Sequence, residues 1–302
     1  MTWVRGTAVA TALLAAALAA AGCGLGPGAD VGSVELTVTR EYGTVPVLEE
    51  SVEAKESDTV MRVLEGSAEI ETSYGGGFVK SIEGVSEAEL GGDPYDWFFY
   101  VDGVESPIGA ADYKLEGGER VWWDYRDWVA TNHVAAVVGQ WPAPFAAGIG
   151  GRRLPVALEC DGGGAACETA RAALVREGVR LASGSPKEAI RVLVGPWSRV
   201  RKDAAARQIE AGPGTSGVYA RFRGEQLLAL DEAGAPAQTL GPDAGLVAAT
   251  SRYGGLPVWV VTGGTAAAVR AAASALNARD LRDHYAVAIR DGKLTPLPVE
   301  GR

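Results

Sequence analysis

The sequence has few of the residues that enzymes and metal sites depend on. It contains two histidines, His133 and His284, and three cysteines in 302 residues. A zinc site needs about four ligands, and neither histidine lies near a cysteine in the sequence. The G-x-S-x-G motif of serine hydrolases and the Walker phosphate loop are both absent. These absences argue against a zinc protein and give no support to a hydrolase or a nucleotide-dependent enzyme.

The motifs that remain stand in the wrong context for catalysis. Residues 212–217, GPGTSG, match the G-x-G-x-x-G spacing, but they follow a predicted helix and precede a predicted strand, whereas a dinucleotide site has the opposite order. A structural role is favoured for His133 and for Asp283-His284 over that of a general base. The acidic stretch VLEESVEAKESD lacks calcium-loop spacing and is expected to be a solvated surface. We therefore predict no enzymatic activity, with a hydrolase as the least favoured alternative.

Positive charge does not balance negative charge, because 28 lysines and arginines stand against 38 aspartates and glutamates, for a formal net charge of −10. An acidic protein is a poor partner for nucleic acid, and its charge does not hold it at an anionic lipid surface. With 47% apolar residues the chain is long enough to bury a core, and about two domains are expected. The sequence gives no prediction of the oligomeric state.

The amino terminus has the pattern of an export signal. Arg5 precedes about fifteen small and apolar residues, a segment too short to span a membrane. The segment ends in LAAAGC, which resembles the lipobox of bacterial lipoproteins, although that motif prefers leucine where Ala20 stands. The resemblance implies a signal at residues 1–22, a lipid on Cys23 and an anchor on the outer face of the bacterial cytoplasmic membrane. An ordinary cleaved signal is the alternative.

The other two cysteines, Cys160 and Cys167, lie in the glycine-rich stretch ECDGGGAAC. This loop is flexible enough to bring two sulfur atoms together, and a disulfide persists where an exported chain resides. Zinc is the alternative, for which too few ligands are present. We predict a Cys160–Cys167 disulfide, which leaves the odd cysteine for the lipid.

Secondary-structure patterns divide the mature chain into two domains. After a linker at residues 23–32, residues 33–130 contain mainly strands, one helix starting near Asp58, an aromatic hairpin turning at Asp102-Gly103, and a second hairpin bending at Gly117-Gly118. Residues 131–153 are rich in proline and glycine and are predicted to be an interdomain linker. In residues 154–302 strands alternate with helices, one of them predicted over SRVRKDAAARQIEAG, which indicates an α/β domain.

The C-terminal domain contains a weak internal echo. The stretches VLVGPWSRVRKDAA and VVTGGTAAAVRAAA share a strand, a glycine and a helix, as a duplicated βαβ-type unit would, and chance is the alternative. The first stretch is also similar to the opening of sporulation-related repeats, which bind peptidoglycan glycan strands. Convergence on a common βα unit would explain that similarity as well.

Aromatic residues on two predicted strands supply the candidate binding surface. Since side chains alternate across a strand, aromatic residues occupy both of its faces. One face is expected to be core, and the other either supports the second domain or forms a platform for a flat or sugar-like ligand. The candidate ligand-binding residues are Trp97, Phe99, Trp122, Trp123, Tyr125 and Trp128.

The aromatic strands also carry a family resemblance. The stretch YDWFFYVDGVESPIGAADYKLEGGERVWWDY, preceded by TVMRVLEG and GGGFVKSIEGV, resembles the transcobalamin-like C-terminal domain family of bacterial surface lipoproteins over about residues 33–128. The resemblance implies a β-grasp-like fold with one helix against a mixed sheet. In the vitamin carriers that name the family, this domain closes over cobalamin together with a large helical barrel, which this sequence lacks. Cobalamin is thus a ligand implied by the resemblance alone, and no individual contact is carried over.

Together these observations predict an α+β protein, with a β-grasp-like N-terminal domain and an α/β C-terminal domain. The expected function is that of an extracytoplasmic, lipid-anchored bacterial protein that binds a small molecule or a cell-wall ligand without enzymatic activity. The alternative is a structural or scaffolding protein that interacts with peptidoglycan or a membrane complex. Buried aromatic residues between the domains would favour the alternative, and an open aromatic groove would favour ligand binding.

Overall fold

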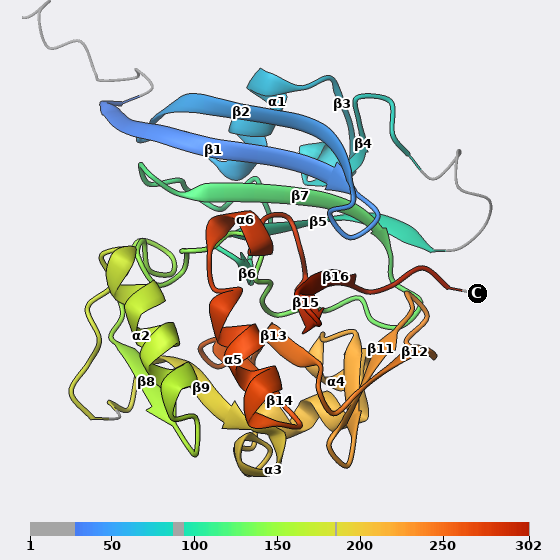
Figure 1. Cartoon of the computed structure of the whole chain (residues 1–302). Helices are drawn as coiled ribbons and strands as arrows, with labels where there is room; N and C mark the ends of the chain where they lie inside the picture. Colours follow the sequence, from blue (N-terminus) through green and yellow to red (C-terminus); the bar gives the residue numbers. More distant parts are fainter. Residues whose placement is uncertain (1–27, 87–93, 185, 302) are drawn as a thin grey trace, which may run out of the picture.

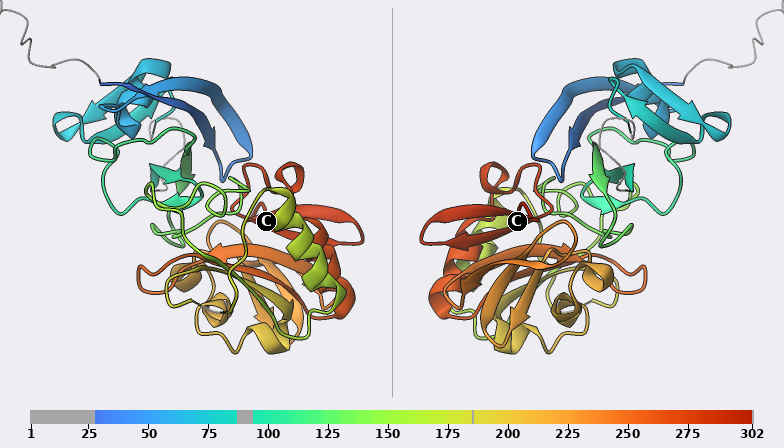
Figure 2. Two further views of the ribbon diagram at one scale, coloured as in Figure 1. Left: turned by 90° about the vertical axis from the view of Figure 1, so that its left-hand side faces the viewer. Right: turned by 90° about the vertical axis from the view of Figure 1, so that its right-hand side faces the viewer.

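The computed structural model describes residues 28–86, 94–184 and 186–301, so Cys23 and the predicted signal lie outside the described residues. Two sheet-based units follow each other along the chain, and the first stands above the second in Figures 1 and 2. The mixture of several sheets with few helices confirms the predicted α+β class. No described helix combines the length and the apolar character that a membrane crossing requires.

The first unit is a mixed sheet with one helix packed on it. Its elements are β1 (Asp30–Arg40), β2 (Val45–Lys55), α1 (Val60–Ser67), β3 (Ile70–Ser73), the 3-10 turn η1 (Tyr74–Gly76), β4 (Phe78–Ile82), β5 (Tyr95–Val101), β6 (Val104–Glu105) and β7 (Arg120–Asp127). The strand order is β2-β1-β7-β5-β6, with β1 and β7 parallel and β3-β4 forming a separate hairpin. The Thr59 side chain caps α1 by accepting a hydrogen bond from the Arg62 amide.

One of the two predicted hairpins is confirmed. Asp102 and Gly103 have φ of 51° and 78° between β5 and β6, as a tight type I′ turn requires. The prediction of a second hairpin at Gly117-Gly118 is wrong, because β7 pairs with β1 and β5 and the chain before it is held by the start of α1. There the Val60 amide donates to the Tyr113 carbonyl.

The second unit contains a six-stranded and a three-stranded sheet. Its elements are β8 (Val156–Cys160), α2 (Ala165–Arg176), β9 (Ile190–Pro196), α3 (Trp197–Val200), η3 (Ala206–Ala211), α4 (Pro213–Ser216), β10 (Ala220–Arg223), β11 (Gln226–Leu230), β12 (Pro236–Gly241), β13 (Gly245–Thr250), β14 (Val258–Gly263), α5 (Ala266–Ser274), α6 (Ala278–Leu281), β15 (Ala286–Arg290) and β16 (Lys293–Leu297). The large sheet has the order β16-β15-β13-β14-β9-β8, and β10, β11 and β12 form the small one.

The large sheet is covered on both faces. Helices α2 and α5 pack on one face, while α3, η3 and the small sheet share the core on the other. The two echoed stretches lie on the neighbouring parallel strands β9 and β14, but the helices after them cover opposite faces. The helix predicted over SRVRKDAAARQIEAG is interrupted, because the Asp203 carboxylate accepts hydrogen bonds from the Ala205 and Ala206 amides and starts a new turn.

The stretch 131–153, predicted as a linker, is itself packed against the second unit. Val134 and Val137 belong to the core on one side of the large sheet, and Val138 belongs to the core on the other side. The indole of Trp141 lies 5.7 Å from that of Trp259 on β14, measured between ring centroids. The connection therefore contributes to the cores of the second unit.

Candidate functional site

The sheet of the first unit buries one face against α1 and the aromatic part of the other face against the second unit. Val34, Leu36, Val121 and Trp123 point toward α1 and form the core of this unit. Tyr100 on β5 and Trp122 on β7 point the other way and pack with the second unit. The aromatic face that the sequence leaves open to two roles is therefore covered by the C-terminal unit, where Tyr219 and Tyr285 belong to the same core as Trp122. Figure 1 shows β15 of that unit below β7.

The six candidate ligand-binding residues do not form one open platform. Trp97, Trp123 and Tyr125 are buried in the first unit, and the Phe99 ring packs 4.9 Å from that of Trp123. Trp122 is fully buried between the units, and Trp128 alone is exposed, with 37% of its surface accessible. Sequence alternation identified the two aromatic faces, but it could not show what covers them.

Tyrosines join the two units. Tyr42, in the turn after β1, places its hydroxyl 2.9 Å from the Tyr219 hydroxyl, and their rings meet edge to face at 5.0 Å. Tyr285, next to β15, packs edge to face on Trp122 at 5.3 Å. These rings come from segments more than a hundred residues apart in the sequence, so no local pattern indicates their contact.

A buried carboxylate lies at the centre of this interface. Asp124 on β7 accepts hydrogen bonds from the Thr39 hydroxyl at 2.6 Å, the Tyr285 hydroxyl at 2.9 Å and the Gly43 amide at 3.1 Å. Burial raises the pKa of Asp124, and the hydrogen bonds from Thr39 and Tyr285 oppose that rise. The Trp122 indole donates to the same Thr39 hydroxyl at 2.7 Å. The network thus spans both units.

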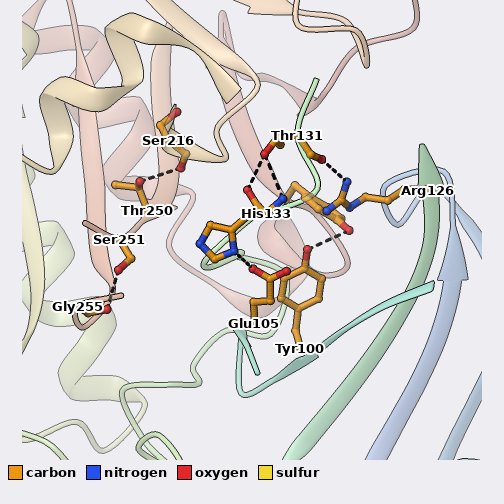
Figure 3. Close-up of polar contacts among 10 residues, drawn as sticks. Tyr100, Glu105, Arg126, Thr131, His133, Ser216, Thr250, Ser251 and Gly255 are labelled. Carbon is orange, nitrogen blue, oxygen red and sulfur yellow. Dashed lines mark hydrogen bonds and ion pairs between the residues drawn. The ribbon is translucent and has the colours of Figure 1, made fainter. Parts of the chain in front are cut away.

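Arg126 is the buried cation of the interface. Its guanidinium carbon lies 3.8 Å from the Phe98 ring centroid, and Nη1 donates to the Asp127 carbonyl. Nη1 also donates to the Thr131 carbonyl (Figure 3). Nε and Nη2 have no hydrogen-bond partner within the described part of the chain. The charge of Arg126 acts on two buried carboxylates, Asp124 and Glu105.

Figure 3 also shows how the first histidine is used. The Nδ1 atom of His133 pairs with Oε2 of Glu105. Burial raises the pKa of Glu105, and the nearby His133 and Arg126 offset only part of that rise. The histidine ring is largely exposed. Ser216 is buried nearby in the view, but its hydroxyl donates to the Gly212 carbonyl and accepts from the Val218 amide. These contacts hold local structure and do not assemble a nucleophile with a base.

The second histidine is part of the packed interior. His284 follows α6, and burial lowers its pKa, so the neutral ring is favoured. Its amide donates to the Leu281 carbonyl, which fixes the chain at the end of the helix. The described residues contain no group of three or more histidine, cysteine, aspartate or glutamate side chains arranged to hold a metal ion.

The predicted disulfide is confirmed between Cys160 and Cys167, whose Cα atoms are 5.9 Å apart. It joins the end of β8 to the first turn of α2. The disulfide lies on the second unit, away from the strands that carry the aromatic residues.

Two exposed aromatic residues of the first unit lie on the β3-β4 hairpin, which no sequence pattern singled out. Tyr74 is 91% exposed and Phe78 is 40% exposed, and their rings are 6.3 Å apart in an edge-to-face arrangement. They border a hollow of about 730 Å³ that Glu71, Lys80 and Tyr95 also line. The glycines in SYGGGF were the available signal, since they make a turn at which an aromatic side chain has little to pack against.

Comparison with known families finds one match, which lies within the first unit. Residues 57–127 match a family described as a domain of unknown function, DUF4430. The match extends from the residues before α1 to the end of β7 and includes the Tyr74-Phe78 hairpin. No curated protein matches the sequence.

Proposed function

We propose that the protein is an extracytoplasmic bacterial lipoprotein, anchored by a lipid on Cys23, that binds a ligand without enzymatic activity. The lipobox-like ending LAAAGC supports the anchor, and the Cys160–Cys167 disulfide agrees with an oxidising compartment. The DUF4430 match falls within residues 33–128, where the sequence resembles transcobalamin-like domains. The first unit is the ligand-binding module in this proposal.

The exposed pair Tyr74 and Phe78 is the observation that carries the proposal. Aromatic side chains are usually buried in the core, so two of them that contact each other at the surface beside a hollow are typical of a binding site. Glu71 and Lys80 add polar groups at the same hollow. A flat apolar ring would stack on the aromatic side chains while its hydroxyl or amide groups bind the polar ones. Sugar rings of the cell wall have such a face, and so does the corrin ring.

Binding is tested with the secreted form that lacks the lipid. Peptidoglycan fragments and a corrinoid are titrated separately, the first by calorimetry and the second by its visible spectrum. The Tyr74→Ala/Phe78→Ala variant should bind the active ligand at least about tenfold more weakly, a loss of about 1.4 kcal/mol. Tyr253→Ala is the matched control, because Tyr253 is equally exposed at 91% but lies on the second unit. Equal affinity of the double variant and the wild type would contradict this site.

The anchor is tested separately by cell fractionation. Cys23→Ser should move the protein from the membrane fraction to the soluble exported fraction. A variant that stays with the membrane would show that another segment holds it there.

A scaffolding role is the second candidate, and the packed aromatic interface between the units favours it. Tyr42, Trp122, Tyr219 and Tyr285 join the units through buried contacts, which is how a rigid spacer would be built. Co-sedimentation with purified peptidoglycan distinguishes the two roles. Sedimentation that Tyr74→Ala/Phe78→Ala leaves unchanged would support scaffolding through another surface.

A further inference from the structure

A second cleft lies between the two units, apart from the Tyr74-Phe78 hairpin. Its volume is about 300 Å³, at the small end of the range for ligand sites. One wall consists of Glu35 and Thr37 on β1, Glu49 on β2 and Arg120 on β7. The opposite wall consists of the turn at residues 139–141 and the end of α6.

One cation at this cleft, the Arg282 side chain, is already paired with two carboxylates. The Arg282 guanidinium pairs with the Glu49 carboxylate across the units and with the Asp283 carboxylate at 3.3 Å. These contacts hold the outer part of the cleft together. Arg120 and Glu35 also line the cleft and take no part in these ion pairs, although the charge of Arg120 acts on Asp283.

Arg120 and Glu35 are neighbours on the sheet but do not pair with each other. They are register partners on the parallel strands β7 and β1, so their side chains extend from the same face of the sheet. Among the described residues, no carboxylate lies within ion-pair distance of Arg120. Arg120 Nη1 instead donates to the Trp141 carbonyl at 2.8 Å, and Glu35 Oε1 accepts from the Ser51 hydroxyl at 2.9 Å. The hydrogen bonds of Arg120 and Glu35 on this wall are thus made to neutral groups.

We propose that this cleft binds a small zwitterion, an α-amino acid or a short unblocked peptide, with its carboxylate on Arg120 and its ammonium group on Glu35. The planar guanidinium suits a carboxylate, and a carboxylate side chain suits an ammonium group. Adjacent strands are about 4.8 Å apart, so a molecule small enough for the cleft can lie between the two side chains. A ligand with one charge would pair with only one of these two side chains. The Thr37 side chain lies at the same wall and offers a hydroxyl to the ligand.

The cleft also links binding to the contact between the units. Its walls come from both units, so a bound zwitterion contacts both of them. A ligand that binds only the assembled cleft stabilises the folded protein in proportion to its concentration. Thermal unfolding therefore reports binding directly, and it does so independently of the aromatic hairpin.

The probes are glycylglycine, which has both charges, N-acetylglycine, which has only the carboxylate, and glycinamide, which has only the ammonium group. At millimolar concentration, glycylglycine should raise the unfolding temperature of the secreted protein, and each singly charged probe should bind about tenfold more weakly. Free glycine and a longer peptide then show whether the cleft takes amino acids or peptide ends. Tyr74→Ala/Phe78→Ala should leave this shift unchanged, which separates the cleft from the first proposed site.

Two variants each remove one of the two charges that would bind the ligand. Arg120→Gln and Glu35→Gln should each weaken glycylglycine binding about tenfold while unfolding remains cooperative. The Glu35→Gln variant keeps an oxygen that accepts from Ser51, so the local structure is retained. Glu53→Gln on the exposed face of β2 and Arg223→Gln on β10 are the matched controls and should bind as the wild type does. The proposal is overturned if glycylglycine does not raise the unfolding temperature, or if N-acetylglycine or glycinamide raises it equally. It is also overturned if neither Arg120→Gln nor Glu35→Gln weakens glycylglycine binding.

Discussion

The Tyr285 hydroxyl of the second unit donates a hydrogen bond of 2.9 Å to Oδ2 of Asp124 on the first unit. Asp124 is fully buried, so its carboxylate depends on protein donors in place of water. Two of the three donors, the Thr39 hydroxyl and the Gly43 amide, belong to the first unit itself. Tyr285 is the donor that the second unit contributes, and it makes the contact between the units specific.

Removal of the Tyr285 hydroxyl should therefore weaken the whole protein. Tyr285→Phe keeps the ring that packs on Trp122 but leaves Asp124 with one donor fewer, and we expect a loss of about 1 to 3 kcal/mol in the free energy of unfolding. Urea unfolding followed by tryptophan fluorescence measures it. Tyr253→Phe, at an exposed position, should change the stability by less than about 0.5 kcal/mol. Equal effects of the two substitutions would contradict a role for this hydrogen bond.

Arg126 should matter more, because its buried charge acts on two buried carboxylates. Arg126→Leu leaves Asp124 and Glu105 without its charge, and we expect a loss of about 3 to 5 kcal/mol on unfolding in urea. Arg126→Lys should be intermediate, since it keeps the charge but not the planar group that lies over Phe98. The exposed Arg223→Leu is the control. A stability of Arg126→Leu within about 0.5 kcal/mol of the wild type would show that the charge is not needed.

Asp102 should make the free energy of unfolding depend on pH. Burial raises the pKa of this side chain from 3.8 to about 7. The folded protein thus binds this proton more tightly than the unfolded chain, so the contribution to stability is complete below the unfolded pKa and is lost as the pH rises toward 7. Asp102→Asn retains the acceptor for the Arg120 amide and suits the positive φ, and it should flatten the decline in stability between about pH 4 and pH 7.

Asp112→Asn is the control for this measurement, because Asp112 is exposed on the same unit. It should leave the pH profile of the unfolding free energy parallel to that of the wild type. If Asp102→Asn also gives a parallel profile, the raised pKa of Asp102 is not responsible for the decline.

The disulfide should stabilise the second unit by restricting the unfolded chain. Its half-cystines are 7 positions apart, and closure of such a short loop is worth about 2 kcal/mol in the chain-entropy account. Cys160→Ser/Cys167→Ser should lose that amount in urea unfolding. A reductant should lower the stability of the wild type to the same level and should not affect the variant. A variant as stable as the oxidised wild type would contradict this account.

Local sequence patterns predicted the parts of the fold that depend on local chemistry. The turn at Asp102-Gly103 needs residues that tolerate positive φ, and the loop between Cys160 and Cys167 needs flexibility, so both could be identified. Alternation on the strands showed that both faces of the first sheet are aromatic. The partner of the second face could not be predicted, because Tyr219 and Tyr285 belong to the second unit and lie far from this sheet in the sequence.

The candidate site was predicted less well for the same reason. Trp97 and Trp122 lie on strands with a strong aromatic pattern, yet tertiary packing covers them. Tyr74 is a single aromatic residue in a glycine-rich turn, so it gave no periodic signal, although it is far more exposed than Trp97 or Trp122. The charges of Arg120 and Glu35 are separated by 85 positions, and only the parallel pairing of β1 with β7 brings them together.

The position of β1 has a practical consequence for recombinant fragments. β1 lies between β2 and β7, but both β1 and β2 precede residue 57, where the family match begins. A fragment cut at the limits of the match would leave the long edge of β7 without its backbone partners and would uncover the apolar side chains beneath it. Such an edge is a template for intermolecular strand addition, so the shortest fragment worth expressing starts near residue 28.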